Sequence, residues 1–290
     1  MHPRPFAYQR AYSVQEALEL LAADAEAKVL AGGQSLVPMM SLGLVAPSQL
    51  VDIGRLECDG IERHNGSVIV GALTRHRELE RSKHGRELLP LAAEAAAHIG
   101  NPHVRNRGTF GGSLAHADPA AELPAVVLAY GGNAIVAGTQ GERRIELEHF
   151  FQDVFTTALE PGELLLGVEL LVPSRSTATA FVEYAERADD FALAAAAALL
   201  EPNGDGTAIK SLRLAMTGVG NGPVRLRDVE QICAGERVRE SLLQHVRDTV
   251  IAGLHPEHDA YVSSRHRRRV AAACAGRAIG TAWNRALERM

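Results

Sequence analysis

The chain has 290 residues, of which 46% are hydrophobic and 22% are charged, a composition typical of a globular protein. Its formal net charge of −5 at pH 7 argues against a nucleic-acid binder, since that function usually needs a basic face. Aromatic residues make up only 4%, so platforms for stacking bases are not expected either.

The cysteines and the apolar runs predict a cytoplasmic protein. Cys58, Cys233 and Cys274 are far apart in the sequence, and such an odd, scattered set fits neither a disulfide framework nor a CxxC site. The N-terminus lacks the apolar stretch of a signal peptide. No apolar run reaches the roughly 18 residues that a membrane span needs, so no span is expected.

Residues 1–56 predict a small lobe of βαβ character. Ser13 and Glu16 form a capping box ahead of a helix, and short strands are expected at 28–30 and 50–53. Between the strands, Pro38 is expected to bar a regular helix. The first strand leads into Ala31-Gly-Gly-Gln-Ser-Leu36, where two adjacent glycines free the backbone to adopt positive φ and leave its amides uncovered. Such a turn can form a nest of N–H groups around a phosphate oxygen.

Residues 57–175 predict a second mixed lobe with strands at 67–71, 134–137 and 164–172. Thr74 is expected to cap a short helix. A longer helix is expected over 88–99, because Gly100 and Pro102 are stop signals.

A loop over 101–112 is then expected to carry a second glycine pair, in Thr109-Phe-Gly-Gly-Ser-Leu114. Asp118 and Pro119 are expected to cap and begin a further helix that ends near Tyr130. Two Gly-Gly loops in one chain favour one ligand with two phosphates.

Residues 176–290 predict a third part in which strands precede helices, so the whole chain is expected to be α+β. A polar seam at 173–179 separates it from the second lobe. The expected strands and helices are 181–184, 191–200, 209–216, 227–234, 239–253 and 264 to the end.

The first glycine block matches no common nucleotide signature, because it has neither a P-loop lysine nor a G-x-G-x-x-G turn. A single Gly-Gly pair is more often a turn than a ligand site, and its paired occurrence is what favours a ligand. Ser35, Thr109 and Ser113 supply hydroxyl donors that suit a pyrophosphate. Glu122 is placed either to accept hydrogen bonds from sugar-like hydroxyls or simply to complement the helix dipole. We expect no metal site and no catalytic triad around His116, since triads use residues from separate elements.

Arg265-His-Arg-Arg-Arg269 is the most basic run of the chain. Five consecutive residues spread around a helix axis, so a solvated face or a subunit contact is favoured over nucleic-acid binding.

Taken together, 31–36, 50–53 and 109–122 resemble the FAD-binding medium subunit of molybdenum hydroxylases, the family of carbon monoxide dehydrogenase and xanthine dehydrogenase. The resemblance covers essentially the whole chain. It implies a two-lobed FAD-binding domain of the PCMH type, with lobes at 1–56 and 57–175. A flavoprotein C-terminal domain with an antiparallel sheet and helices is implied at 176–290.

The resemblance also implies which residues bind FAD, and no catalytic residue or metal ligand is implied on this chain. The two glycine blocks would hold the pyrophosphate, Glu122 the ribityl chain, and three apolar or aromatic positions the flavin ring. The implied cofactor-binding residues are Ala31, Gly32, Gly33, Gln34, Ser35, Leu36, Ile99, Thr109, Gly111, Gly112, Ser113, Glu122, Leu165 and Phe191. Glu183, which stands where many relatives have lysine, would lower the flavin potential if it lies close.

The implied function is that of a flavoprotein subunit in a molybdenum-dependent hydroxylase. Electrons would come from [2Fe–2S] clusters on a small partner subunit and leave FAD for an external acceptor. A large molybdopterin subunit would choose the substrate, and the complex would be a dimer of heterotrimers. Two alternatives remain: a stand-alone FAD-dependent oxidase or dehydrogenase, and a non-enzymatic nucleotide-binding assembly factor.

Overall fold

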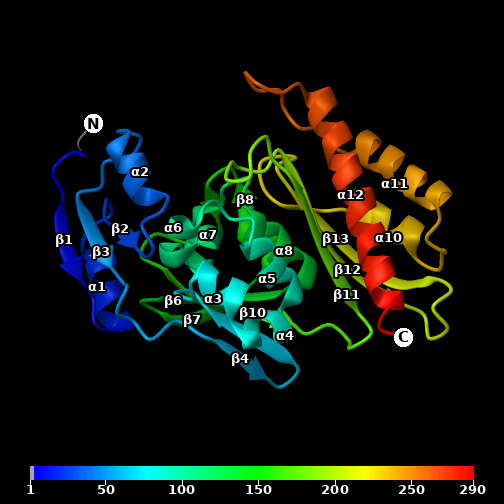
Figure 1. Ribbon diagram of the computed structural model, residues 1–290. Helices are drawn as coiled ribbons and strands as arrows, with labels where there is room; N and C mark the ends of the chain where they lie inside the picture. Colours follow the sequence, from blue (N-terminus) through cyan, green and yellow to red (C-terminus); the bar gives the residue numbers. More distant parts are fainter. Residues whose placement is uncertain (1–2) are drawn as a thin grey trace.

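The computed structural model describes residues 3–290, which form three parts in chain order (Figure 1). We call them the N-terminal lobe, the middle lobe and the C-terminal domain, and each is defined by its main sheet. The three sheets contain β1 to β3, then β4 to β7 with β10, then β11 to β14. Sheets and helices that are segregated in this way confirm the α+β class. Within residues 3–290, no helix combines the length and apolarity needed to cross a membrane.

The N-terminal lobe is a three-stranded parallel sheet in the order β1-β3-β2. Its elements are β1 (Ala7–Arg10), α1 (Val14–Ala23), β2 (Lys28–Leu30), α2 (Leu36–Ser41) and β3 (Gln49–Asp52). The Ser13 cap is confirmed, since its hydroxyl accepts a hydrogen bond from the Glu16 amide at 3.1 Å. The Glu16 carboxylate, however, accepts from the amide of Tyr12 at 2.8 Å rather than from that of Ser13.

Helix α2 corrects the prediction that Pro38 bars a helix between the two strands. Pro38 is the third residue of α2. In the first turn of a helix the amides have no intrahelical partner, so the missing N–H of proline costs nothing there. Because α2 begins at Leu36, the first glycine pair leads directly into the N-terminus of a helix.

The middle lobe is an antiparallel sheet in the order β4-β5-β10-β6-β7, with its helices largely gathered on one face (Figure 1). Its strands are β4 (Ile61–His64), β5 (Ser67–Gly71), β6 (Gly132–Gly138), β7 (Gly141–Glu146), β8 (Phe151–Asp153), β9 (Thr156–Thr157) and β10 (Leu164–Leu171). Its helices are α3 (His76–Arg81), α4 (Lys83–Leu88), α5 (Pro90–Ala96), α6 (Pro102–Arg107), α7 (Phe110–His116), α8 (Glu122–Tyr130) and α9 (Leu147–Phe150). Buried Tyr130 joins two of these helices, since its hydroxyl accepts a hydrogen bond from the Leu91 amide at 3.2 Å.

Two predicted helix boundaries of this lobe are wrong. The helix expected over 88–99 is shorter: α4 ends at Leu88, Leu89 has a non-helical backbone, and α5 covers only Pro90–Ala96. Pro90 is the reason, because a proline disfavours the helical conformation of the residue before it. Thr74 does not cap α3: Arg75 occupies the cap position, and the Thr74 hydroxyl donates to the carbonyl of Gly60 at 3.0 Å.

The C-terminal domain is an antiparallel sheet in the order β11-β12-β13-β14, followed by three helices. Its elements are β11 (Ala178–Tyr184), β12 (Ala194–Pro202), β13 (Ile209–Thr217), β14 (Val224–Arg225), α10 (Arg227–Cys233), α11 (Glu240–Gly253) and α12 (Ser264–Leu287). The alanine-rich β12 is buried on both faces, by the middle lobe on one side and by α12 on the other. Small side chains on a central strand let both layers approach closely.

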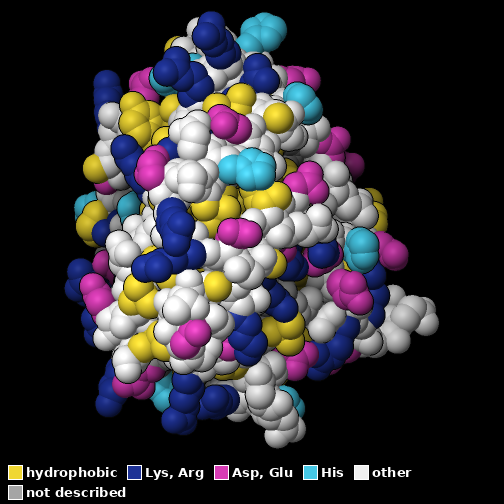
Figure 2. All heavy atoms as spheres, turned by 90° about the vertical axis from the view of Figure 1, so that its right-hand side faces the viewer, with side chains coloured by type: hydrophobic (Ala, Val, Ile, Leu, Met, Phe, Trp, Pro, Cys, Tyr) yellow, Lys and Arg dark blue, Asp and Glu magenta, His cyan; other side chains and the backbone are white. Residues whose placement is uncertain are grey.

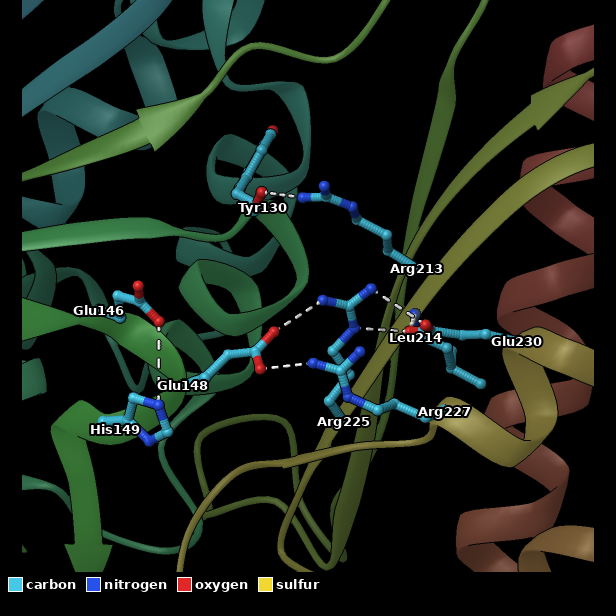
Figure 3. Close-up of polar contacts among 9 residues, drawn as sticks. All are labelled: Tyr130, Glu146, Glu148, His149, Arg213, Leu214, Arg225, Arg227 and Glu230. Carbon is cyan, nitrogen blue, oxygen red and sulfur yellow. Dashed lines mark hydrogen bonds and ion pairs between the residues drawn. The ribbon is translucent and has the colours of Figure 1, made fainter.

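Charged side chains join the middle lobe to the C-terminal domain at two places. In Figure 3, Glu148 of α9 lies against Arg225 and Arg227, with its carboxylate 3.1 Å from Arg225, and Arg213 donates to the carbonyl of Tyr130. At the second place Arg285 of α12 holds Glu94 of α5 with two hydrogen bonds of 2.9 Å. Bidentate pairs of this kind fix orientation as well as distance.

Candidate functional site

The first glycine pair lies between the end of β2 and the start of α2, directly against the middle lobe. Gly33 has φ of +73°, which glycine adopts without strain. Gly32 packs so closely on the backbone of Arg107 that a Cβ there would collide with the Arg107 carbonyl and lie 2.9 Å from the Cα of Gly108. Only glycine allows the two lobes to meet at this point.

Five consecutive amides of this loop are open. Within residues 3–290, the N–H groups of Gly32 through Leu36 donate to no protein acceptor. Ser35 occupies the cap position of α2, but its hydroxyl caps nothing and is exposed. Successive amides that face a helix N-terminus form a site for an anion such as a phosphate. The positive φ that the sequence predicted is thus observed at Gly33, and the amides that follow it have no protein acceptor within residues 3–290.

The second glycine pair is not in a loop, which corrects the expectation for 101–112. That stretch contains α6, and Gly111 and Gly112 lie in the first turn of α7. Their amides are used inside the protein: Gly111 donates to the carbonyl of Ala72 at 2.8 Å, and Gly112 donates to the Thr109 hydroxyl at 3.1 Å. An ideal Cβ on Gly111 would lie 2.5 Å from the Cβ of Ala72. The pair thus packs α7 against the end of β5, and the Ser113 hydroxyl is left half-exposed.

Two arginines that the sequence did not single out lie at the open loop: the backbone of Arg107 packs on Gly32, and the side chain of Arg75 bonds to that backbone. The Arg75 guanidinium donates to the carbonyl of Arg107, and the backbone of Arg75 forms a β-bridge with Thr109. Burial, reinforced by the positive charge of Arg107, lowers the pKa of Arg75 below its usual value. Positive charge beside open amides strengthens the attraction for an anion. No local motif marks these arginines, because the topology alone brings them to the loop.

Glu122 is the first residue of α8, and this corrects the expected start of that helix at Pro119. Asp118 instead accepts a hydrogen bond from the Ala120 amide at 2.9 Å, in a turn before the helix. Glu122 is only 6% exposed. Burial, together with repulsion from Glu183 and Asp118, raises its pKa to about 8.

The negative charge of Glu183, on β11, thus opposes the ionisation of Glu122, which the sequence could not establish. Burial raises the pKa of Glu183 itself to about 7. Its Oε2 atom is buried and has no hydrogen-bond partner within residues 3–290. A buried oxygen without a partner is costly unless a ligand or water satisfies it.

The remaining expected residues have different surroundings. Ile99 and Leu165 are buried in the core of the middle lobe. Leu165 is next to Leu166, whose carbonyl accepts from the Ala72 amide at 2.9 Å, so the second glycine pair and β10 meet at Ala72. Phe191 is 71% exposed on the segment before β12. Gln34 and Leu36 belong to the open loop, and Ala31 directly precedes it.

Comparison with known proteins identifies both halves of the chain. Residues 4–173 match the family described as the FAD binding domain in molybdopterin dehydrogenase, and residues 179–282 match the CO dehydrogenase flavoprotein C-terminal domain. Carbon monoxide dehydrogenase from Hydrogenophaga pseudoflava has a similar structure, with a TM-score of 0.95 and 33% identity over 98% of this chain and 99% of that one. Quinoline 2-oxidoreductase from Pseudomonas putida 86 is also similar in structure, with a TM-score of 0.94 and 33% identity over 99% of this chain and 100% of that one.

Curated relatives agree with this result. The alpha subunit of the 6-hydroxypseudooxynicotine dehydrogenase complex from Paenarthrobacter nicotinovorans is 36% identical over 99% of this chain and 97% of its own. The medium chain of glyceraldehyde dehydrogenase from Sulfolobus acidocaldarius is 35% identical over 93% of this chain and 95% of its own.

The fold and the site thus define a flavoprotein made of an FAD-binding domain and a C-terminal domain. More specifically, the chain belongs to the family of FAD-binding medium subunits of molybdenum hydroxylases, which are oxidoreductases. The residues present fit the cofactor. Open amides and two arginines suit a pyrophosphate, and the buried carboxyls of Glu122 and Glu183 suit groups that form hydrogen bonds.

Proposed function

We propose that this chain binds FAD, receives electrons from the [2Fe–2S] clusters of a partner subunit and passes them to an external acceptor. The observation that carries the proposal is the run of open amides from Gly32 to Leu36, held against the backbone of Arg107 and Gly108. Bound FAD supplies the redox chemistry, and the protein supplies binding, orientation and electrostatics. We propose no acid, base or metal ligand on this chain.

Within the proposed FAD site, each group of residues has a separate task. The open loop binds the pyrophosphate through amides and the Ser35 hydroxyl, with Arg75 and Arg107 adding positive charge. Buried Glu122 contacts the sugar-alcohol chain. The proposed binding residues are Ala31, Gly32, Gly33, Gln34, Ser35, Leu36, Ile99, Thr109, Gly111, Gly112, Ser113, Glu122, Leu165 and Phe191. We also propose the domain division 1–56, 57–175 and 176–290.

We further propose that the chain works in the cytoplasm with a small iron–sulfur subunit and a large molybdopterin subunit, as a dimer of heterotrimers. Relatives named as a medium chain or as one subunit of a complex support the existence of partners. The choice of substrate belongs to the large subunit.

Helix α12 provides the surface that best suits such a partner. It has six arginines and no acidic residue over Ser264–Leu287. Arg267 and Arg285 are used internally, by Asp259 and Glu94. The other four line two hollows beside α12, one of about 410 Å³ that includes Tyr184 of β11 and one of about 310 Å³ that includes Ile251 of α11. Figure 2 shows Lys and Arg side chains gathered at the upper end of this face. Arginine and tyrosine are enriched at protein interfaces.

FAD titration of two serine variants tests the binding site. Ser35→Ala removes a hydroxyl that caps nothing, so its FAD affinity should fall about fivefold to tenfold while the stability of the FAD-free chain changes little. The matched control is Ser13→Ala, which removes a working helix cap on α1, outside the loop. That variant should lose about 1 kcal/mol of stability and keep its FAD affinity. Unchanged FAD affinity in Ser35→Ala would contradict the proposed role of the loop.

A further inference from the structure

A partly buried ion pair joins α3 to α6 in the middle lobe. Arg105 of α6 donates from Nε to Oε2 of Glu80, on α3, at 3.0 Å. The two side chains are 14% and 19% exposed, so solvent ions screen the pair only weakly. Among residues 3–290 no other carboxylate pairs with Arg105. Glu80 therefore fixes the direction in which the guanidinium points.

The same guanidinium holds the turn that connects α5 to α6, which we call the 99–101 turn. Its Nη1 atom donates to the carbonyl of Ile99 at 3.1 Å and to that of Gly100 at 2.7 Å. Gly100 has φ of +41°, so the chain reverses here in a conformation that favours glycine. Arg105 thus satisfies two carbonyls that lie outside both helices.

This arrangement determines where the amides of the turn point. A trans peptide is planar, so the C=O of one residue and the N–H of the next point in opposite directions. Because the carbonyls of Ile99 and Gly100 face Arg105, the amides of Gly100 and Asn101 face away from it. Neither amide donates to a protein acceptor within residues 3–290. The turn therefore presents two successive N–H donors on the side opposite Arg105.

Helix α6 connects the 99–101 turn to the open loop of the first glycine pair. The helix covers only Pro102–Arg107, which is about 9 Å at 1.5 Å per residue. At its end, the backbone of Arg107 packs on Gly32. The turn is thus one short helix away from the loop amides, within reach of a ligand as long as FAD.

We propose that Arg105 and Glu80 are positioning residues, which orient the 99–101 turn so that its two open amides donate to the flavin ring of FAD. This inference rests on the proposed function, in which Ile99 is an FAD-binding residue. The flavin ring has carbonyl oxygens and ring nitrogens that accept hydrogen bonds. Donors that are fixed in advance lose little freedom on binding, so the ion pair contributes to affinity without touching the cofactor.

Visible circular dichroism and phosphorus NMR of the FAD-loaded full chain test this role, because they report on the two ends of the cofactor separately. The dichroism of the flavin bands depends on the surroundings of the ring, and the phosphorus resonances depend on those of the pyrophosphate. In Arg105→Lys a single ammonium group replaces the planar fork, so it cannot hold Glu80 and both carbonyls together. We expect altered flavin dichroism, unchanged phosphorus resonances and an FAD affinity about tenfold weaker.

Two further variants separate positioning from a general loss of packing. Glu80→Gln keeps an acceptor for Arg105 but removes the charge, so its flavin dichroism should change in the same direction and its FAD affinity should fall only about threefold. Arg77→Lys is the matched control, because Arg77 of α3 donates to the Asn106 side chain of α6 at 2.8 Å rather than to the turn. It should keep the wild-type dichroism and affinity. If Arg105→Lys fails to fold, Glu80→Gln carries the test.

The outcomes distinguish this inference from the proposed function. Flavin dichroism that stays as in the wild type in both variants would overturn the positioning role and leave the FAD site intact. Shifted phosphorus resonances in these variants would overturn it too, since the ion pair would then support the lobe as a whole. A chain that takes up no FAD would instead overturn the proposed function.

Discussion

At the residue scale, Gly32 shows how a single missing side chain lets two lobes form one site. Its amide belongs to the open loop of the N-terminal lobe, while its Cα rests on the backbone of Arg107 in the middle lobe. Backbone groups cannot move aside as the end of a flexible side chain can. A methyl group at residue 32 would therefore push the loop away from Arg107 and from Arg75, which bonds to it.

Gly32→Ala should weaken FAD binding by at least about tenfold, because it separates the loop amides from the two arginines. The measurement is an FAD titration followed by flavin fluorescence. Gly204→Ala is the control, since nothing lies within 4 Å of a Cβ there and its φ is not positive. If Gly32→Ala bound FAD as tightly as this control, the contact between the lobes would have no part in the site.

Glu122 makes the stability of the FAD-free chain depend on pH in a definite direction. In the unfolded chain the carboxyl has the ordinary glutamate pKa of 4.5, and in the folded chain burial raises its pKa to about 8. Between these values the unfolded chain has released the proton and the folded chain still holds it. Stability contributed by the protonated group is thus present below about pH 4.5 and is lost as the pH rises toward about 8.

Glu122→Gln removes this titration, so the variant should gain stability relative to the wild type as the pH rises. The gain should be no more than about 1.4 kcal/mol per pH unit. Denaturant unfolding of both proteins at about pH 5 and about pH 8 measures it. A difference between the two proteins that stays constant with pH would contradict the buried, protonated state of Glu122.

At the element scale, the beginning of α8 is fixed from the neighbouring domain rather than by its own sequence. The helix has no capping side chain, and the Thr217 hydroxyl donates to carbonyls of the turn before it. The Gly218 amide also donates to the carbonyl of Pro119, at 2.7 Å. Strand β13 thereby sets the position of Glu122.

Thr217→Val should destabilise the chain by about 1–3 kcal/mol, because it removes the buried hydroxyl that bonds to two carbonyls while keeping the side-chain volume. It should also weaken FAD binding by displacing Glu122. Thr249→Val is the control: its hydroxyl bonds to the carbonyl of His245 on the exposed face of α11, so the change should stay within about 0.5 kcal/mol. Chemical unfolding compares the two, and equal losses would show that the bridge to α8 has no special role.

Local sequence signals predicted the elements well where a cap, a turn or a periodic pattern acts alone. The helix cap at Ser13 and the strands at 28–30 and 67–71 follow such signals. The start of α8 could not be read in this way, because Asp118 and Pro119 look like a cap and a first helical residue. Contacts from β13 hold that segment as a turn instead.

At the scale of the whole molecule, three sheets in chain order could be predicted from the order of the expected strands and helices and from the polar seam at 173–179. The contacts between these parts could not be predicted, since they depend on single side chains that are far apart in the sequence. Glu94 of α5 meets Arg285 of α12 only because the middle lobe and the C-terminal domain pack together, and Arg75 reaches Arg107 only through the path of the chain between α3 and α6. The open amides at 32–36 were predictable, whereas the closed ones at 111–112 were not.

Charge reversal on α12 tests the proposed partner surface. Arg265→Glu with Arg269→Glu should weaken assembly with the other subunits at least about tenfold, and the effect should diminish at high salt. FAD binding to the single chain should stay as in the wild type. Arg63→Glu, an exposed change on β4, is the control for added negative charge. Size-exclusion chromatography of the co-expressed subunits measures assembly, and an intact complex with both changes would place the interface elsewhere.

We propose above that this chain carries FAD and that its electrons come from an iron–sulfur partner. The most direct measurement follows flavin absorbance after the FAD-loaded chain is mixed with the reduced partner subunit under anaerobic conditions. The account predicts one FAD per chain and rapid bleaching of the flavin only when the partner is present. Bleaching by an organic substrate without the partner, or a chain that takes up no FAD, would contradict it.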